Sequence, residues 1–153
     1  MVKVRKGFTL VELLIVIVII GILAAAMLLS SGAATASAEA STIISDLRNM
    51  KAASLMLYAD SMDIFENSTT YTLTVTYLTP YVDNPAKYTI SGSPYGLSVD
   101  STRRWWVYYN LSNKSSEVKS KLQGRAQTTG LLKSTNLTDS YTTASNTVWM
   151  VAR

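Results

Sequence analysis

The 153-residue sequence contains no cysteine and no histidine. Their absence excludes disulfide bonds, thiol nucleophiles, thiolate zinc sites and imidazole bases. We therefore expect a protein that is not an enzyme and that carries no cofactor and no metal. The lack of cysteine does not fix the compartment, because disulfides are permitted rather than required in secreted proteins.

A contiguous basic stripe is also missing, although 14 basic residues stand against 10 acidic ones. Three of the basic residues, Lys3, Arg5 and Lys6, precede the first apolar run, and the others are scattered among the acidic residues. Nucleic-acid binding through counterion release needs clustered charge, so we do not expect a nucleic-acid partner. The length allows one head domain of ordinary size.

An apolar run extends from Leu13 to Leu29, and with residues 8–11 included it is interrupted only by Glu12. As a helix rising about 1.5 Å per residue, it is long enough to cross a bilayer core of about 30 Å. Basic residues precede the run, and none follows it before Arg48. The positive-inside rule then places residues 1–7 in the cytoplasm and the chain after the run outside.

Glu12 is the informative residue of this segment. A carboxylate in a membrane helix costs about 2–3 kcal/mol on insertion and is seldom kept without a partner. Apart from the first residues of the chain, no lysine or arginine can reach it on the membrane side. Cleavage before Phe8 would remove those residues and create a free α-amino group, in the same chain or in a neighbour, as the simplest partner.

The stretch Lys6-Gly7-Phe8-Thr9-Leu10-Val11-Glu12-Leu13-Leu14, followed by an apolar helix, resembles the class III signal of type IV prepilins and pseudopilins. The resemblance implies that a prepilin peptidase cleaves between Gly7 and Phe8 and methylates Phe8, giving N-methylphenylalanine. It also implies that Glu12 pairs with the Phe8 amine of a neighbouring subunit during assembly.

The same resemblance implies a precursor in the bacterial cytoplasmic (inner) membrane, spanning it once with its N-terminus in the cytoplasm. The product would be an extracellular or periplasmic helical filament of many copies. An assembly ATPase and a membrane platform protein would be further partners. The chain departs from many pilins at Leu29, where they carry a proline, and it lacks the cysteines of their C-terminal loop.

Several alternatives stay open. The subunit belongs to a type IV pilus in one reading, and in another it is a pseudopilin of a type II secretion or DNA-uptake system. An ordinary secretory signal would instead end at Ala36-Ser37-Ala38, ahead of Glu39. A fourth alternative is an uncleaved single-pass anchor that carries a monomeric extracytoplasmic binding domain.

The sequence divides into four expected parts: a leader (1–7), a transmembrane or filament-core helix (8–29), an amphipathic helix continuing into the head (30–62) and a globular head (63–153). Apolar or small residues spaced by three and four predict the buried face of the amphipathic helix. They are Ile43, Leu47, Met50, Ser54 and Leu57.

Alternation of apolar and polar residues predicts a strand from Tyr71 to Tyr77. The breakers Asn84-Pro85 and the stretch from Ser91 to Gly96 limit Lys87–Ile90 to a short strand at most and make residues 91–103 a loop. We expect a central strand over Trp105–Leu111 and a last one over Thr147–Ala152. Between them we expect a helix over Ser116–Gln123, with Ser116 as its N-cap and with Val118 and Leu122 inward. The fold class is α+β, a long N-terminal helix packed on a small antiparallel sheet.

Three further groups are weaker candidates for sites. Asp60, Asp63 and Glu66 would suit calcium, but solvated acids at a helix end are the favoured interpretation. Met50, Met56 and Met62 are expected to fill the core rather than bind a partner. The Arg103-Arg104-Trp105-Trp106 stretch would stack on a sugar or base, or, as we favour, pack its aromatics on the long helix.

Overall fold

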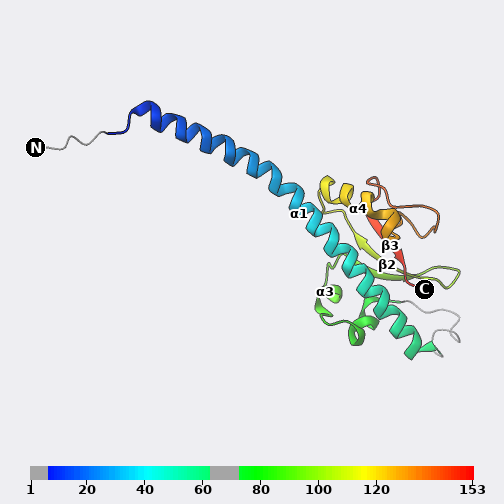
Figure 1. Ribbon diagram of the computed structural model, residues 1–153. Helices are drawn as coiled ribbons and strands as arrows, with labels where there is room; N and C mark the ends of the chain where they lie inside the picture. Colours follow the sequence, from blue (N-terminus) through cyan, green and yellow to red (C-terminus); the bar gives the residue numbers. More distant parts are fainter. Residues whose placement is uncertain (1–6, 63–72) are drawn as a thin grey trace, which may run out of the picture. The chain divides into compact units, whose positions relative to one another are not determined.

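The computed structural model describes residues 7–62 and 73–153 (Figure 1). Two compact units are present, residues 1–35 and residues 36–153, and helix α1 (Leu10–Asp60) contributes to both. Within the N-terminal unit the backbone stays helical past Gly21 and through Leu29 to Gly32. The glycines therefore do not interrupt the helix.

The C-terminal unit is built on a three-stranded antiparallel sheet with the order β1-β2-β3. The strands are β1 (Tyr95–Val99), β2 (Trp105–Asn110) and β3 (Thr147–Val151). Val107 of β2 pairs with Leu97 on one side and with Met150 on the other, which fixes the register of the whole sheet. The central position expected for the aromatic strand is confirmed.

One face of α1 closes the core over this sheet. The five residues of the predicted face are at most 5% exposed, and so are Ala36 and Ala40, one to two turns earlier. The ring of Tyr58 meets the ring of Trp105 edge to face at 5.6 Å. The periodicity of the sequence therefore identified the buried face, but the small residues that extend it toward residue 36 carried no apolar signal.

Helix α4 (Ser116–Thr129) covers another part of the core with Val118, Leu122 and Ala126. The helix expected to end at Gln123 is thus longer. Its N-cap is Ser115, whose Oγ accepts a hydrogen bond from the Val118 N–H, and not the predicted Ser116. The helix ends at Gly130, whose φ of 71° is the left-handed conformation in which a glycine carries no steric penalty.

The strand predicted from Tyr71 to Tyr77 is wrong where it can be checked. Residues 71 and 72 lie outside the described part, and Val75–Tyr81 forms the 3-10 helix η1. Its buried residue is Leu78, whereas Tyr77 is 52% exposed. Alternation with strong β-formers is only a local preference, and within residues 7–62 and 73–153 no strand is paired with this segment.

The short strand considered for Lys87–Ile90 is also wrong, because Ala86–Thr89 is the helical turn α3. Pro85 precedes it with a φ of −62°, a value that suits the first turn of a helix. The loop expected over 91–103 contains β1, so this prediction is wrong as well. Gly96, taken for a breaker, lies in this strand. A Cβ there would come within 2.0 Å of the Tyr108 ring, so this position of the strand requires a glycine.

Core filling by methionine holds for Met50 alone, which is fully buried. Met56 and Met62 are 55% and 46% exposed, so for them the prediction is wrong. Met56 stands six positions after Met50, and on a helix that spacing turns a side chain well away from the same face.

Candidate functional site

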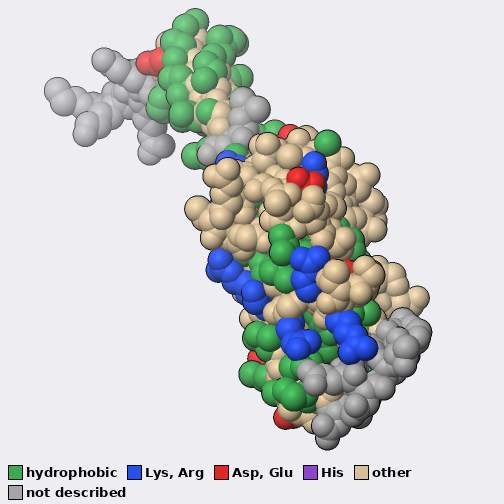
Figure 2. All heavy atoms as spheres, turned by 90° about the vertical axis from the view of Figure 1, so that its right-hand side faces the viewer, with side chains coloured by type: hydrophobic (Ala, Val, Ile, Leu, Met, Phe, Trp, Pro, Cys, Tyr) green, Lys and Arg blue, Asp and Glu red, His purple; other side chains and the backbone are tan. Residues whose placement is uncertain are grey.

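The N-terminal unit exposes an apolar helical surface from Leu10 to Leu28. From Leu10 to Leu28 the large aliphatic side chains are at least half exposed, and Glu12 is the only charged residue among them. In the view of Figure 2, hydrophobic side chains cover most of the visible face of this segment. Helix α1 is long and apolar enough to cross a membrane by length and composition. A helix that is apolar on all sides needs lipid or other helices around it.

At the start of this helix, Thr9 and Glu12 form a capping box. The Thr9 hydroxyl accepts a hydrogen bond from the Glu12 N–H at 3.2 Å, and Glu12 Oε2 accepts one from the Thr9 N–H at 2.9 Å. The Thr9 hydroxyl also donates to Oε2 at 2.8 Å. Two N–H groups that the helix cannot satisfy itself are thereby satisfied.

This arrangement gives Glu12 a partner that sequence reasoning missed. The signal was present, since a threonine followed three residues later by a glutamate is the pattern of a capping box. Both hydrogen bonds to the carboxylate use Oε2, and among the described residues Oε1 has none. One oxygen of the carboxylate is therefore still able to accept.

Gly7 and Phe8 precede the helix. Neither has regular secondary structure, and Phe8 is 90% exposed. A Cβ on Gly7 would meet no atom within 4 Å, and the residue is not in the left-handed region. The fold of this chain therefore places no demand for glycine at position 7.

The long N-terminal helix, the small three-stranded antiparallel sheet and the additional helices make an α+β, pilin-like layout. Residues 2–28 match the family model of the prokaryotic N-terminal methylation motif, which is the class III prepilin signal of type IV pilin-like proteins. No curated protein and no solved structure shows significant similarity to the chain.

The motif supports a type IV pilin-like or pseudopilin protein. That family is structural and typically not enzymatic, and its motif implies processing by a prepilin peptidase and assembly into a filament. The apolar helix agrees with membrane anchoring followed by a surface filament.

The acidic candidates at the end of α1 are not brought together as a metal site in the described residues. Asp60 accepts a hydrogen bond from the Tyr81 hydroxyl at 2.9 Å, and Asp63 and Glu66 lie outside the described part. Residues 7–62 and 73–153 contain no group of three acidic side chains that could hold a metal ion.

The Arg103–Trp106 stretch does not offer its indoles to a ligand, since Trp105 and Trp106 are both fully buried. Trp105 packs on α1 as predicted. Trp106 points to the other face of the sheet, so the expectation that both pack on the long helix is wrong for it. The alternation of side chains along a strand makes two consecutive residues face opposite sides.

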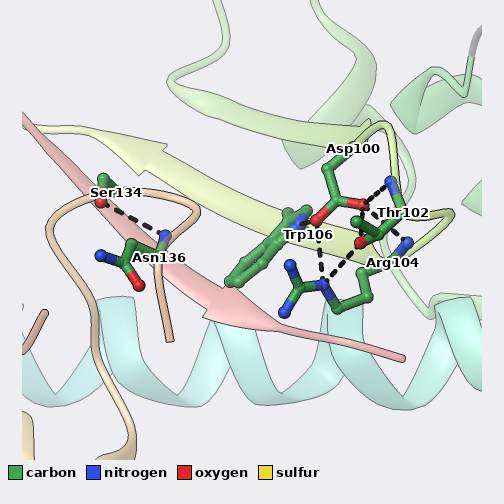
Figure 3. A network of polar contacts seen from close by, with 6 residues as sticks. All are labelled: Asp100, Thr102, Arg104, Trp106, Ser134 and Asn136. Carbon is green, nitrogen blue, oxygen red and sulfur yellow. Dashed lines mark hydrogen bonds and ion pairs between the residues drawn. The ribbon is translucent and has the colours of Figure 1, made fainter. Parts of the chain in front are cut away.

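Asp100 organises the turn that joins β1 to β2, as Figure 3 shows. Its Oδ1 accepts from the Thr102 hydroxyl and N–H at 2.6 and 2.8 Å and from the Arg104 N–H at 3.0 Å. Its Oδ2 accepts from Arg104 Nε and from the Trp106 indole N–H, both at 3.0 Å. Desolvation raises the pKa of this carboxyl, but the hydrogen bonds from Thr102, Arg104 and Trp106 together hold it well below its ordinary value.

We expect Asp100 to make the head acid-sensitive. Because the folded state depresses its pKa, the stabilisation is present above the unfolded pKa of about 3.9 and is lost as the pH falls below it. Asp100→Asn should lower the unfolding free energy at pH 7 by about 1–3 kcal/mol. It should also make the unfolding free energy fall less steeply between pH 5 and pH 2. Urea unfolding of the full chain in detergent, followed by circular dichroism, measures both.

Asp139→Asn is the control, because Asp139 pairs with Lys133 at 3.5 Å at the surface, where the two side chains are 35% and 45% exposed. Such a surface pair contributes about 0–1 kcal/mol. If the unfolding free energy of Asp100→Asn fell as steeply between pH 5 and pH 2 as that of the wild type, Asp100 would not be the source of the acid sensitivity.

The head also contains a polar cluster that the sequence did not reveal. The buried carboxylate of Asp46 on α1 accepts from Lys87 Nζ at 2.7 Å and from the Tyr95 hydroxyl. Lys87 and Tyr95 follow Asp46 in the sequence by 41 and 49 positions. They join α1 to α3 and β1, so we assign the cluster to holding the head together.

Proposed function

We propose that this chain is the structural subunit, a pilin, of a type IV pilus or a type IV pilus-like filament, and that it polymerises through its N-terminal hydrophobic helix. The observation that carries the proposal is an exposed helical segment, apolar on all sides, that begins with a single carboxylate. In the precursor, lipid surrounds this segment; in the filament, the same segments of other subunits do.

Processing between Gly7 and Phe8 prepares the subunit. The fold of the chain does not require a glycine at position 7. We attribute the need for Gly7 to the peptidase, which has to bring the backbone into its active site. The bond to be cleaved lies ahead of the helix, where no helical hydrogen bond has to be broken. Cleavage removes the basic leader, and Phe8 becomes the N-methylated N-terminus.

Glu12 then selects the position of the incoming subunit. Before assembly, the capping box with Thr9 satisfies one carboxylate oxygen within the chain. The second oxygen accepts the charged Phe8 amine of a neighbouring subunit. In the low-dielectric core of a helix bundle, an unpaired charge is costly, so only the axial register that pairs the two groups is stable.

Polymerisation needs a supply of energy. Burial of about 1,000 Å² of apolar surface from water would yield about 25 kcal/mol, but transfer from lipid recovers far less. An assembly ATPase and a membrane platform protein fit this requirement. The precursor would span the bacterial inner membrane once, with residues 1–7 in the cytoplasm.

The mature N-terminus tests the proposal. We expect mass spectrometry of filaments sheared from cells to show a chain that starts at Phe8 and carries one N-methyl group. A chain that starts at Met1 or Val2 would leave only a tethered domain, and one that starts at Glu39 would establish an ordinary secretory signal. Electron microscopy of the same cells separates a pilus, with long surface fibres, from a pseudopilus without them.

A further inference from the structure

A cationic groove of about 330 Å³ lies between α1 and α4 in the C-terminal unit. Among the described residues, the charged ones that line it are Arg48 and Arg125, and none is acidic. The other lining residues are Ser41, Ser45, Asn49 and Thr129, which are polar, and Ile44. Guanidinium groups surrounded by hydroxyls suit an oxyanion, which they bind with paired N–H groups.

Both guanidinium groups are available to an anion. Arg125 is held in place by two hydroxyl oxygens, Ser41 Oγ at 2.6 Å from one terminal nitrogen and Ser37 Oγ at 2.8 Å from the other. Neither partner carries charge, so the positive charge of Arg125 is not neutralised. Arg48 is exposed and makes no ion pair or hydrogen bond with the described residues.

A second hollow, of about 370 Å³, lies on the other flank of α1, against η1 and α3. Asn49 of α1 lines both hollows and thus marks the ridge between them. Figure 1 shows α4 and α3 on either side of this part of α1. The second hollow has Asp83 at its edge, exposed and without an ion pair or hydrogen bond in the described part.

Lys87 also lines the second hollow, but its charge is paired with Asp46 at 2.7 Å. The other acidic side chains of the described head, apart from Glu117, each have an ion-pair or hydrogen-bond partner. Glu39, Asp46, Asp100 and Asp139 form ion pairs, and Asp60 accepts from Tyr81. Glu117 is exposed, but it belongs to α4, the helix that forms one wall of the Arg48–Arg125 groove.

We propose that the Arg48–Arg125 groove of one subunit binds the Asp83 carboxylate of the next subunit. The two surfaces consist of different residues, and we propose that each groove binds the Asp83 of the next subunit in one direction only. Such a contact is heterologous and can repeat without closing, as a filament requires. This inference rests on the proposed function, and it adds a contact between heads to the contact between N-terminal helices.

Cross-linking tests the contact directly, because the natural chain has no cysteine to interfere. Full-length Arg48→Cys and Asp83→Cys chains are expressed together with the assembly machinery, and sheared filaments are treated with a short bis-maleimide. We expect a covalent dimer on a denaturing gel. Each variant alone, and Asp83→Cys together with Lys121→Cys on the exposed side of α4, should give monomer.

Charge reversal supplies the second measurement. Arg48→Glu should reduce the sheared filament fraction about tenfold, and adding Asp83→Arg should restore it to within about threefold of the wild type. Lys121→Glu makes the same change of charge outside the groove and should alter the yield by less than about twofold.

The outcomes separate the two proposals. Suppose that the wild type forms filaments, that the Arg48→Cys and Asp83→Cys pair gives only monomer, and that Arg48→Glu has a normal yield. These results would overturn this contact and leave the proposal of a filament subunit intact. No filament from the wild type with its machinery would overturn the proposed function and this contact with it.

Discussion

Replacing Glu12 by alanine is expected to abolish filaments while leaving the precursor in the membrane. Removal of the carboxylate relieves an insertion cost of about 2–3 kcal/mol, so membrane integration should not suffer. Assembly should fail because the Phe8 amine of the neighbouring subunit would be left unpaired in an apolar core. Immunoblots of membrane and sheared fractions measure the two effects separately, and we expect at least about a hundredfold less sheared protein, the scale of about 3 kcal/mol.

Two matched variants separate pairing from capping. Glu12→Gln keeps an oxygen that can accept from the Thr9 N–H, since glutamine also serves in capping boxes, but it has no charge. Thr9→Val removes the hydroxyl that bonds with Glu12 and keeps the carboxylate. If Glu12 acts through the amine, Glu12→Gln should fail like Glu12→Ala, and Thr9→Val should still assemble. Normal filaments from Glu12→Gln would show that capping is its role.

Replacing Trp105 by alanine should cost the head most of its stability. Trp105 is fully buried at the start of the central strand β2 and meets Tyr58 of α1 edge to face at 5.6 Å. Removal of a buried indole costs about 3–5 kcal/mol through lost transfer free energy and the cavity that remains. A domain of this size is stable by only about 5–15 kcal/mol, so the unfolded fraction should rise steeply.

Urea unfolding of the full chain in detergent, followed by circular dichroism, measures this loss. Leu137→Ala is the control, because Leu137 is 51% exposed and its removal should change the unfolding free energy by less than about 0.5 kcal/mol. An equal effect of the two substitutions would contradict the packing of α1 on the sheet through Trp105.

The buried face of α1 could be predicted because a helix repeats every 3.6 residues, and Ile43, Leu47 and Met50 follow that period. The aromatic strand was equally predictable, since Trp105 to Asn110 contains little but strong β-formers. These segments are long or strongly patterned, so their local preference and their final environment agree.

Short segments were less predictable. Threonine alternates from residue 72 to residue 76, yet Val75 begins a 3-10 helix, and no strand of the described residues pairs with it. Gly96 looked like a breaker, but its missing side chain leaves room for the Tyr108 ring of the adjacent strand. Pairing partners come from distant parts of the chain, and a local pattern cannot supply them.

The sequence by itself determined the N-terminal signal, the apolar helix and the position of the single carboxylate in it. Each of these depends on residues that are adjacent or within one helical turn. Only the tertiary structure decided that Asp46 meets Lys87 and Tyr95, and that Arg48 and Arg125 line one groove. The partners are separated by 41 positions for Asp46 and Lys87 and by 77 positions for Arg48 and Arg125. Only the packing of α1 against the rest of the head brings them together.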